Sequence, residues 1–106
     1  MSTIEKMISQ PQWHWEEGML AHPYYKKSQQ VRMKAGCDER SWIPVLNDPC
    51  TLSAIALKII TAGGSIKREG TSYVINDTLR AKKLEEIICE GLLLTWSTQS
   101  SDSKNS

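Results

Sequence analysis

The chain has 106 residues, of which 40% are hydrophobic and 24% are charged, and its formal net charge at pH 7 is +1. This length suits one small domain built around one core, and the composition is that of an ordinary globular protein. The near-neutral charge argues against a strongly acidic mimic of DNA and against a strongly basic nucleic-acid coat protein, although a local acidic or basic patch remains open.

The first forty residues predict a short helix, several strands and a turn. Apolar residues at helical spacing predict about two turns of helix over residues 3–9, which Pro11 ends. Strands are predicted where β-branched or aromatic residues lie next to turn residues or alternate with polar ones. These strand segments are residues 12–21, 18–21 and 30–35. Residues 36–40 are predicted to form the turn that leads to the next strand.

The clearest structural signal lies in residues 42–52. Pro44 and Pro49 both restrict the residue before them to extended conformations, which predicts a strand over residues 42–46. Asp48 followed by Pro49 predicts a helix start, because the carboxylate accepts free backbone N–H groups and proline has no N–H to leave unpaired. We therefore expect a helix to begin at Pro49.

A helix and a hairpin are predicted next. Leucine and isoleucine at helical spacing predict a helix over residues 49–62, which Gly63–Gly64 ends, since glycine takes a left-handed cap without a Cβ clash. The β-branched and aromatic content of residues 65–75 predicts a β-hairpin that turns at Glu69–Gly70.

The last third of the chain predicts a second helix and a tail. Asn76 or Asp77 is expected to cap a helix over residues 78–91. Residues 98–106 are polar and rich in serine, which predicts a disordered tail. Together the elements predict an α+β fold: a small antiparallel sheet of three to four strands with two main helices packed on one face. We expect a single domain over residues 1–97.

The segment at the helix start also supports a resemblance. Its spacing is Trp42-x-Pro44-x-Leu46-x-Asp48-Pro49-x-Thr51, followed by a helix. This resembles a pattern in small uncharacterised proteins of tailed-phage and prophage genomes. The resemblance covers the chain from Trp42 to the second helix and leaves out residues 1–30. It implies a phage accessory protein and nothing about catalysis.

Cysteine usage and hydropathy indicate the compartment. The cysteines Cys37, Cys50 and Cys89 are odd in number and widely spaced, which does not suit a disulfide framework and favours a reducing cytoplasm. Residues 1–10 lack the long apolar segment of a secretory signal, and Leu92–Leu94 is far too short to span a bilayer. We expect a cytoplasmic protein, located in the host cytoplasm if it is phage-encoded, with no membrane partner.

Residue patterns that support catalysis or cofactor binding are missing. No C-x-x-C or H-x-x-x-H pair occurs, so the sequence predicts no metal site. No G-x-x-x-x-G-K-[ST], G-x-G-x-x-G or G-x-S-x-G motif is present, so we expect neither a nucleotide cradle nor a serine nucleophile. We therefore expect a protein that is not an enzyme and has no cofactor. A cysteine enzyme that uses Cys50 is a distant third alternative.

Two groups of residues are candidates for binding a partner. The first is aromatic, because tryptophan and tyrosine anchor protein interfaces: Trp13, Trp15, Tyr24 and Tyr25. Since the chain has no phenylalanine, the alternative is that Trp13 and Trp15 complete the core together with Trp42 and Trp96. The second group is basic, and it either holds phosphates or forms a solvated surface: Lys26, Lys27, Arg32, Lys34, Lys67 and Arg68.

The leading functional prediction is a non-enzymatic, phage-encoded interaction protein that binds a host protein and modulates or inhibits it. The phage resemblance alone suggests a defence complex, of the CRISPR or restriction type, as the target. The alternative is a small nucleic-acid-binding regulatory module that uses a basic hairpin and a basic strand. We expect a monomer or a homodimer, since a small sheet leaves an edge strand exposed.

Overall fold

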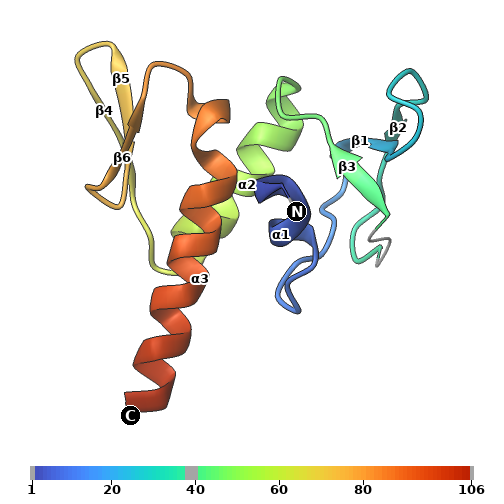
Figure 1. The fold of residues 1–106 in the computed structure, drawn as a ribbon. Coiled ribbons are helices and arrows are strands. Elements are labelled where there is room, and N and C mark those ends of the chain that lie inside the picture. The colour runs from blue at the N-terminus through green and yellow to red at the C-terminus, as the bar shows by residue number, and fades with distance from the viewer. Residues whose placement is uncertain (1, 38–40, 106) are drawn as a thin grey trace. The chain divides into compact units, whose positions relative to one another are not determined.

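The structure, a computed structural model, describes residues 2–37 and 41–105 (Figure 1). The chain divides into two compact units, Met1–Ala54 and Ile55–Ser106, and each is described by itself. Each unit contains helix and a three-stranded antiparallel sheet, which confirms the predicted α+β class. The strands are therefore shared between two small sheets, where the sequence suggested one. The single domain over residues 1–97 stays a prediction.

The first unit contains a short helix and a sheet with the strand order β2-β1-β3. Helix α1 spans Thr3–Ile8, as predicted, and the strands are β1 (Leu20–Pro23), β2 (Val31–Arg32) and β3 (Trp42–Pro44). The sequence placed the first strand too early, over residues 12–21. Residues 13–16 take no regular structure, and their alternating tryptophans turn inward to fill the core of this unit instead.

The start of helix α2 (Pro49–Thr61) follows the prediction closely. The Thr51 backbone N–H donates to Asp48 Oδ2 over 3.1 Å, so Asp48 is the helix cap. The Thr51 hydroxyl donates to the same carboxylate oxygen over 3.0 Å and accepts the Leu20 N–H over 2.7 Å. Because Thr51 is fully buried, its hydroxyl fastens the first turn of α2 to β1 within this unit.

The second unit contains a sheet with the strand order β4-β5-β6, a 3-10 turn and a long helix. The strands are β4 (Ile66–Glu69), β5 (Ser72–Ile75) and β6 (Leu79–Ala81), followed by η1 (Leu84–Glu86) and α3 (Ile88–Asn105). The predicted hairpin is present, and Gly70 at its turn has a φ of 62°, which favours glycine.

The predicted second helix over residues 78–91 is wrong in its first half. Asn76 and Asp77 do not cap a helix but form a left-handed turn, with φ values of 53° and 60°, and the chain then returns as β6 along β5. Asparagine and aspartate are favoured both in helix caps and in such turns. The helix begins only at Ile88 and continues to Asn105, so it includes most of the predicted tail.

One side chain connects three segments of this second unit. Asn76 Oδ1 accepts the Ser65 N–H over 2.8 Å, and Asn76 Nδ2 donates to Thr95 Oγ1 on α3 over 2.9 Å. Thr95 in turn donates its hydroxyl hydrogen to the Gly91 carbonyl over 2.8 Å.

No helix in the described part of the chain has both the length and the apolar character that a bilayer span requires.

Candidate functional site

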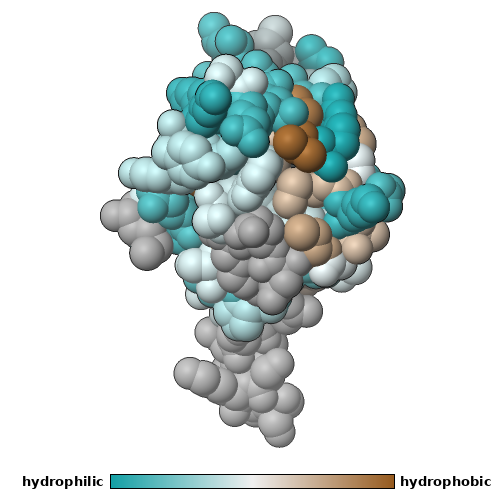
Figure 2. Space-filling view, turned by 90° about the vertical axis from the view of Figure 1, so that its right-hand side faces the viewer, coloured by the Kyte–Doolittle hydropathy of each residue, from teal (hydrophilic) through white to brown (hydrophobic). Residues whose placement is uncertain are grey.

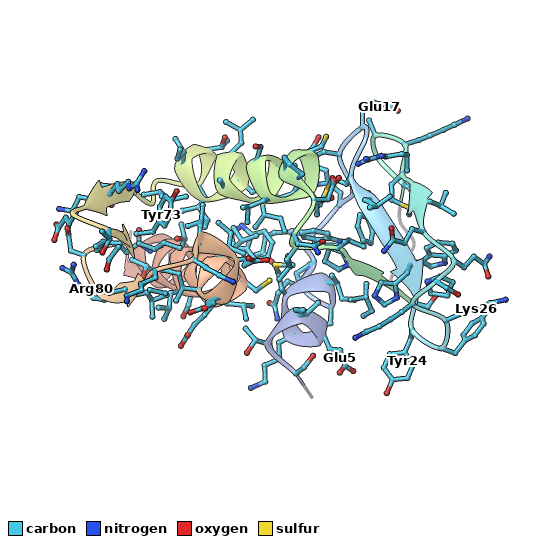
Figure 3. The ribbon with its side chains drawn as sticks, turned by 90° about the horizontal axis from the view of Figure 1, so that it is seen from above. Glu5, Glu17, Tyr24, Lys26, Tyr73 and Arg80 are labelled. Atoms are coloured by element: carbon cyan, nitrogen blue, oxygen red, sulfur yellow. The ribbon has the colours of Figure 1, made fainter. Side chains whose placement is uncertain are left out.

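Among the described residues of the first unit, the most exposed large hydrophobic side chains lie in the turn after β1. Tyr24 is 71% exposed and Tyr25 is 83% exposed, and the neighbouring Lys26 and Lys27 are exposed as well. The Lys26 N–H donates to the Pro23 carbonyl over 3.1 Å, which closes the turn. Tyr24 and Lys26 project away from the ribbon there (Figure 3). We call residues 24–27 the tyrosine turn.

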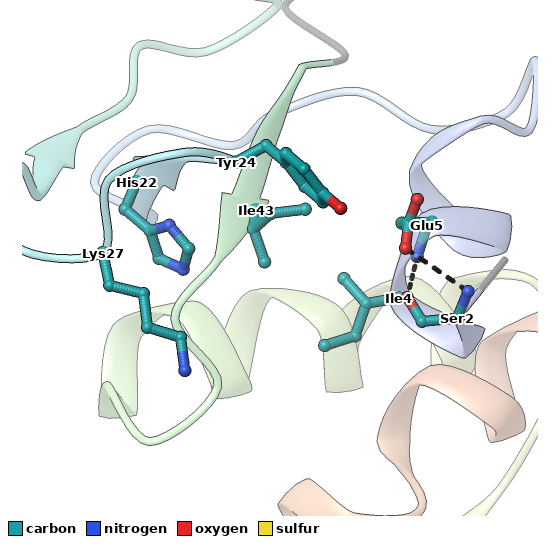
Figure 4. Close-up of a pocket in the computed structure, with 7 residues that line it drawn as sticks. All are labelled: Ser2, Ile4, Glu5, His22, Tyr24, Lys27 and Ile43. Atoms are coloured by element: carbon teal, nitrogen blue, oxygen red, sulfur yellow. Dashed lines mark hydrogen bonds between the residues drawn. The ribbon is translucent and has the colours of Figure 1, made fainter.

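A pocket of about 200 Å³ lies next to the tyrosine turn, and two of the turn residues line it. Its lining comes from the start of α1, from β1, from the turn and from β3 (Figure 4). The seven lining residues are Ser2, Ile4, Glu5, His22, Tyr24, Lys27 and Ile43. We call this the turn pocket.

The strand register explains why the β1 and β3 side chains meet in the turn pocket. His22 and Ile43 are direct partners in the β1–β3 pairing, so their side chains share one face of the sheet. Tyr24 follows His22 by two residues, which places it on that same side at the end of the strand. Figure 4 shows the His22 ring between Lys27 and Ile43.

His22 carries a buried ring whose second nitrogen has no protein partner in the described residues. His22 as a whole is 8% exposed, and its Nδ1 lies 2.7 Å from the Pro23 carbonyl oxygen. A carbonyl only accepts hydrogen bonds, so Nδ1 carries a hydrogen and donates it. In the neutral ring, Nε2 is then an acceptor. The pocket therefore offers one acceptor nitrogen fixed in direction by a buried ring.

The α1 side of the turn pocket is held by a capping box. The Glu5 N–H donates to Ser2 Oγ over 3.2 Å, and the Ser2 N–H donates to Glu5 Oε1 over 3.4 Å. These reciprocal bonds fix the first turn of α1 and hold the Glu5 carboxylate on its own helix. Ile4 follows the cap and faces Ile43, so the two aliphatic side chains form the apolar part of the lining (Figure 4).

Trp13 and Trp15 belong to the core and not to a binding surface, which corrects their place among the candidate binding residues. They are 2% and 0% exposed, and their rings meet edge to face with centroids 5.2 Å apart. A partner cannot contact side chains that are this deeply buried. The alternative that the sequence left open, that these tryptophans complete a core without phenylalanine, is the one the structure supports.

Arg32 and Lys34 differ in how they are used. Arg32 donates to Asp48 Oδ2 over 2.7 Å and to the Gly18 carbonyl over 3.0 Å. Its guanidinium holds the pKa of the Asp48 carboxyl below its usual range. Lys34 is exposed and makes no ion pair with any residue that the structure describes. Arg32 thus has a structural partner, and Lys34 remains available.

The basic residues of the hairpin lie in the second unit, and acidic side chains accompany them. The Lys67 ammonium pairs with Asp77 and lies 3.5 Å from Glu69, which raises the pKa of Lys67. Arg68 lies over the Tyr73 ring, with its guanidinium carbon 5.6 Å from the ring centroid. The hairpin is therefore a partly neutralised surface.

Sequence reasoning missed most of the turn pocket. Tyr24 and Lys27 were candidates, whereas Ser2, Ile4, Glu5, His22 and Ile43 were not. A local signal existed for one part, because Ser-x-x-Glu at residues 2–5 is a capping-box pattern. The approach of α1 to β3 and the β1–β3 register are long-range features that no local pattern encodes.

Metal and thiol chemistry have little support in the described residues. Among them, no group of three or more His, Cys, Asp or Glu side chains is placed to hold a metal ion. Cys50 is exposed and Cys37 is half-buried. Cys89 is buried, and its burial raises the pKa of the thiol to about 12. On the face shown in Figure 2, hydrophilic surface predominates and hydrophobic side chains are confined to a small area.

Comparisons with known proteins add no family to these observations. No protein-family model, no curated protein and no solved structure matches the chain. The resemblance to phage accessory proteins stays a prediction.

Proposed function

We propose that this protein is a non-enzymatic interaction protein that binds another protein through the tyrosine turn and the turn pocket. The observation that carries the proposal is the exposure of Tyr24 and Tyr25, side by side on a turn and next to a pocket. Tyrosine anchors interfaces because it buries a large area while few rotatable bonds are frozen. An aromatic pair beside a concave site is the arrangement in which such anchors bind.

The class of partner comes from the resemblance of residues 42–51 to phage proteins. On that basis we propose a host protein as the partner and modulation or inhibition as the outcome. The target that we propose is a defence complex of the CRISPR or restriction type, because its inhibition would directly benefit a phage. Binding through the turn pocket does not depend on which class of protein the partner belongs to.

Nucleic-acid binding is the second candidate, and one observation favours it. Lys26, Lys27 and Lys34 are exposed and have no ion-pair partner among the described residues. Against it, Arg32 and Lys67 are engaged with carboxylates within their own units. A basic side chain that is already paired with a carboxylate must break that ion pair before it contacts a phosphate. We therefore rank protein binding first.

The test is capture of a partner from a bacterial host lysate with the full-length tagged protein. We expect one stoichiometric protein partner, and we expect Tyr25→Ala to release it while the thermal midpoint stays unchanged, because this side chain is almost fully exposed. Leu57→Ala is the matched control. Leu57 is 63% exposed in the second unit, so it also removes an exposed hydrophobic side chain.

Three results would contradict the proposal. Capture that survives Tyr24→Ala and Tyr25→Ala together would remove the tyrosine turn from the interface. Equal loss in Leu57→Ala would indicate general stickiness. Binding of single-stranded oligonucleotide that weakens steeply with salt, and that is lost on charge reversal of Lys26 and Lys27, would favour the nucleic-acid alternative.

A further inference from the structure

The turn pocket has the size of one side chain. Pockets that bind cofactors or drug-sized ligands generally enclose about 300–1,000 Å³. The turn pocket has a volume of about 200 Å³ and is a shallow depression that is broadly open to solvent. It is therefore too small for a nucleotide, and it suits one anchoring side chain from a larger partner.

The lining favours an aliphatic anchor. Ile4 and Ile43 supply the apolar contact, and they lie between the polar groups of α1 and those of the tyrosine turn (Figure 4). Burial of a branched aliphatic side chain against two isoleucines is favourable, whereas burial of a charged side chain there is unfavourable because it loses its hydration. The Tyr24 side chain extends over the same region and lengthens the apolar wall.

The charges of the lining favour an acidic neighbour for that anchor. On the turn side, the Lys27 ammonium has no ion-pair partner among the residues that the structure describes, and the adjacent residue, Lys26, is exposed as well. On the α1 side, the Glu5 carboxylate is already held by the Ser2 N–H. A carboxylate beside the anchor therefore meets the unpaired lysine and stays away from Glu5.

His22 supplies the third point of recognition. Its Nδ1 is committed to the Pro23 carbonyl, so the neutral ring presents Nε2 as an acceptor. A partner backbone next to the anchor carries N–H donors, and one of them can satisfy this nitrogen. Because His22 is a buried residue and its Nδ1 is bonded to the Pro23 carbonyl, the direction of this acceptor is fixed before binding.

We propose that the turn pocket binds a leucine or isoleucine side chain from an acidic segment of a protein partner. The carboxylate next to that side chain pairs with Lys27, and a backbone N–H of the segment donates to His22 Nε2. This inference rests on the proposed protein-binding function and specifies the chemistry of the partner at this site.

The test uses the full-length protein, with the methyl signals of Ile4 and Ile43 as the NMR readout. The probes are three capped pentapeptides: acetyl-Gly-Asp-Leu-Asp-Gly-amide, its analogue with lysine in place of aspartate, and its analogue with alanine in place of leucine. We expect the acidic leucine peptide to shift both methyl signals, with a Kd of about 1 mM, since so small a ligand has few atoms to contribute. Both analogues should bind roughly fivefold to tenfold more weakly.

Charge reversal locates the interaction. Lys27→Glu should weaken the acidic peptide by about tenfold, and Lys34→Glu should leave it within about twofold, because only Lys27 lines the pocket. Lys34 is the matched control, since it is also exposed, lies in the same unit and has no described ion-pair partner. Both variants should keep the thermal midpoint of the parent protein.

The inference is overturned if neither methyl signal shifts at about 10 mM acidic peptide. It is also overturned if the lysine analogue binds as well, if Lys34→Glu weakens binding as much as Lys27→Glu, or if an oligothymidylate shifts the same signals more strongly. Failure here is distinguishable from failure of the proposed function. If the peptides fail to bind but a partner is still captured from the lysate in a Tyr25-dependent manner, the proposed function stands and only the aliphatic anchor is refuted.

Discussion

Removal of the Asp48 side chain should destabilise the protein by an amount that its hydrogen bonds set. In Asp48→Ala, the Thr51 N–H and hydroxyl both lose an acceptor, at 3.1 and 3.0 Å. Loss of a helix cap costs about 1 kcal/mol, and a buried hydroxyl left with a poorer partner costs about 1 kcal/mol more. The Thr51 hydroxyl has the Leu20 carbonyl at 3.4 Å as its remaining acceptor.

We therefore expect Asp48→Ala to lower the free energy of unfolding by about 2 kcal/mol, measured by urea denaturation. For a chain of this length, that corresponds to a fall in the thermal midpoint of about 8 °C. Asp48→Asn is the matched control, because asparagine caps helices as well as aspartate does, and its loss should stay below about 1 kcal/mol. Equal losses in the two variants, or a loss below about 0.5 kcal/mol in Asp48→Ala, would refute the capping argument.

The stability difference between the parent protein and Asp48→Asn should depend on pH, with a sign that follows from the pKa of Asp48. Arg32 lowers the pKa of Asp48 in the folded state, below its ordinary value of 3.8. The ionised carboxylate therefore stabilises the folded state above pH 3.8, and this contribution is lost as the pH falls through the lower, folded-state pKa. The stability difference between the parent protein and Asp48→Asn should be constant near neutrality and shrink in acid. A difference that grows in acid would contradict the assignment.

Three further predictions concern the second unit and the thiols. Gly91→Ala should lower the free energy of unfolding by about 1–3 kcal/mol, because a Cβ there would lie 2.7 Å from Ile75 Cγ2. In a double-mutant cycle measured by denaturation, Gly91→Ala combined with Ile75→Ala should lose less stability than the sum of the two single losses. Asn76→Ala should lower the free energy of unfolding by about 1 kcal/mol more than Asn76→Gly. Both variants lose the side-chain hydrogen bonds, but only alanine is strained at a φ of 53°. Equal thermal midpoints of the two variants would argue against this strain. In a thiol-reagent assay at pH 8, Cys50 should react at once and Cys89 only on unfolding, since burial disfavours the Cys89 thiolate; rapid labelling of both would contradict that burial.

The sequence predicts the helix start at Pro49 well, because every part of that signal is local. Asp48, Pro49 and Thr51 lie within one turn of one another, so capping chemistry predicts the helix start from neighbouring residues alone. The hairpin at Gly70 is predictable for the same reason, since its turn and its strands are adjacent in sequence.

The residues from Asn76 onward were misassigned because their local signal has two meanings. Asn and Asp are favoured both as helix caps and in left-handed turns. The choice between them is made by long-range contacts: β6 pairs with β5, and the Asn76 side chain bonds Ser65 and Thr95. No local pattern reports these partners.

The candidate site was predicted in part for a similar reason. The exposure of Tyr24 and Tyr25 could be expected from the polar residues that follow them. Burial of Trp13 and Trp15 could not be decided locally, because core and interface use the same residue types. The turn pocket depends on the pairing of His22 with Ile43, two residues that are far apart in the sequence.

The bonds of Asn76 also bear on how the second unit opens. Asn76 lies in the β5–β6 turn, and its side chain bonds Ser65 in the loop after α2 and Thr95 on helix α3. None of the three can move away without exposing polar groups that the others had satisfied. Amide hydrogens of Ser65 and of the β5–β6 ladder should therefore exchange with solvent in a single cooperative event, so that this half of the chain behaves as one foldon.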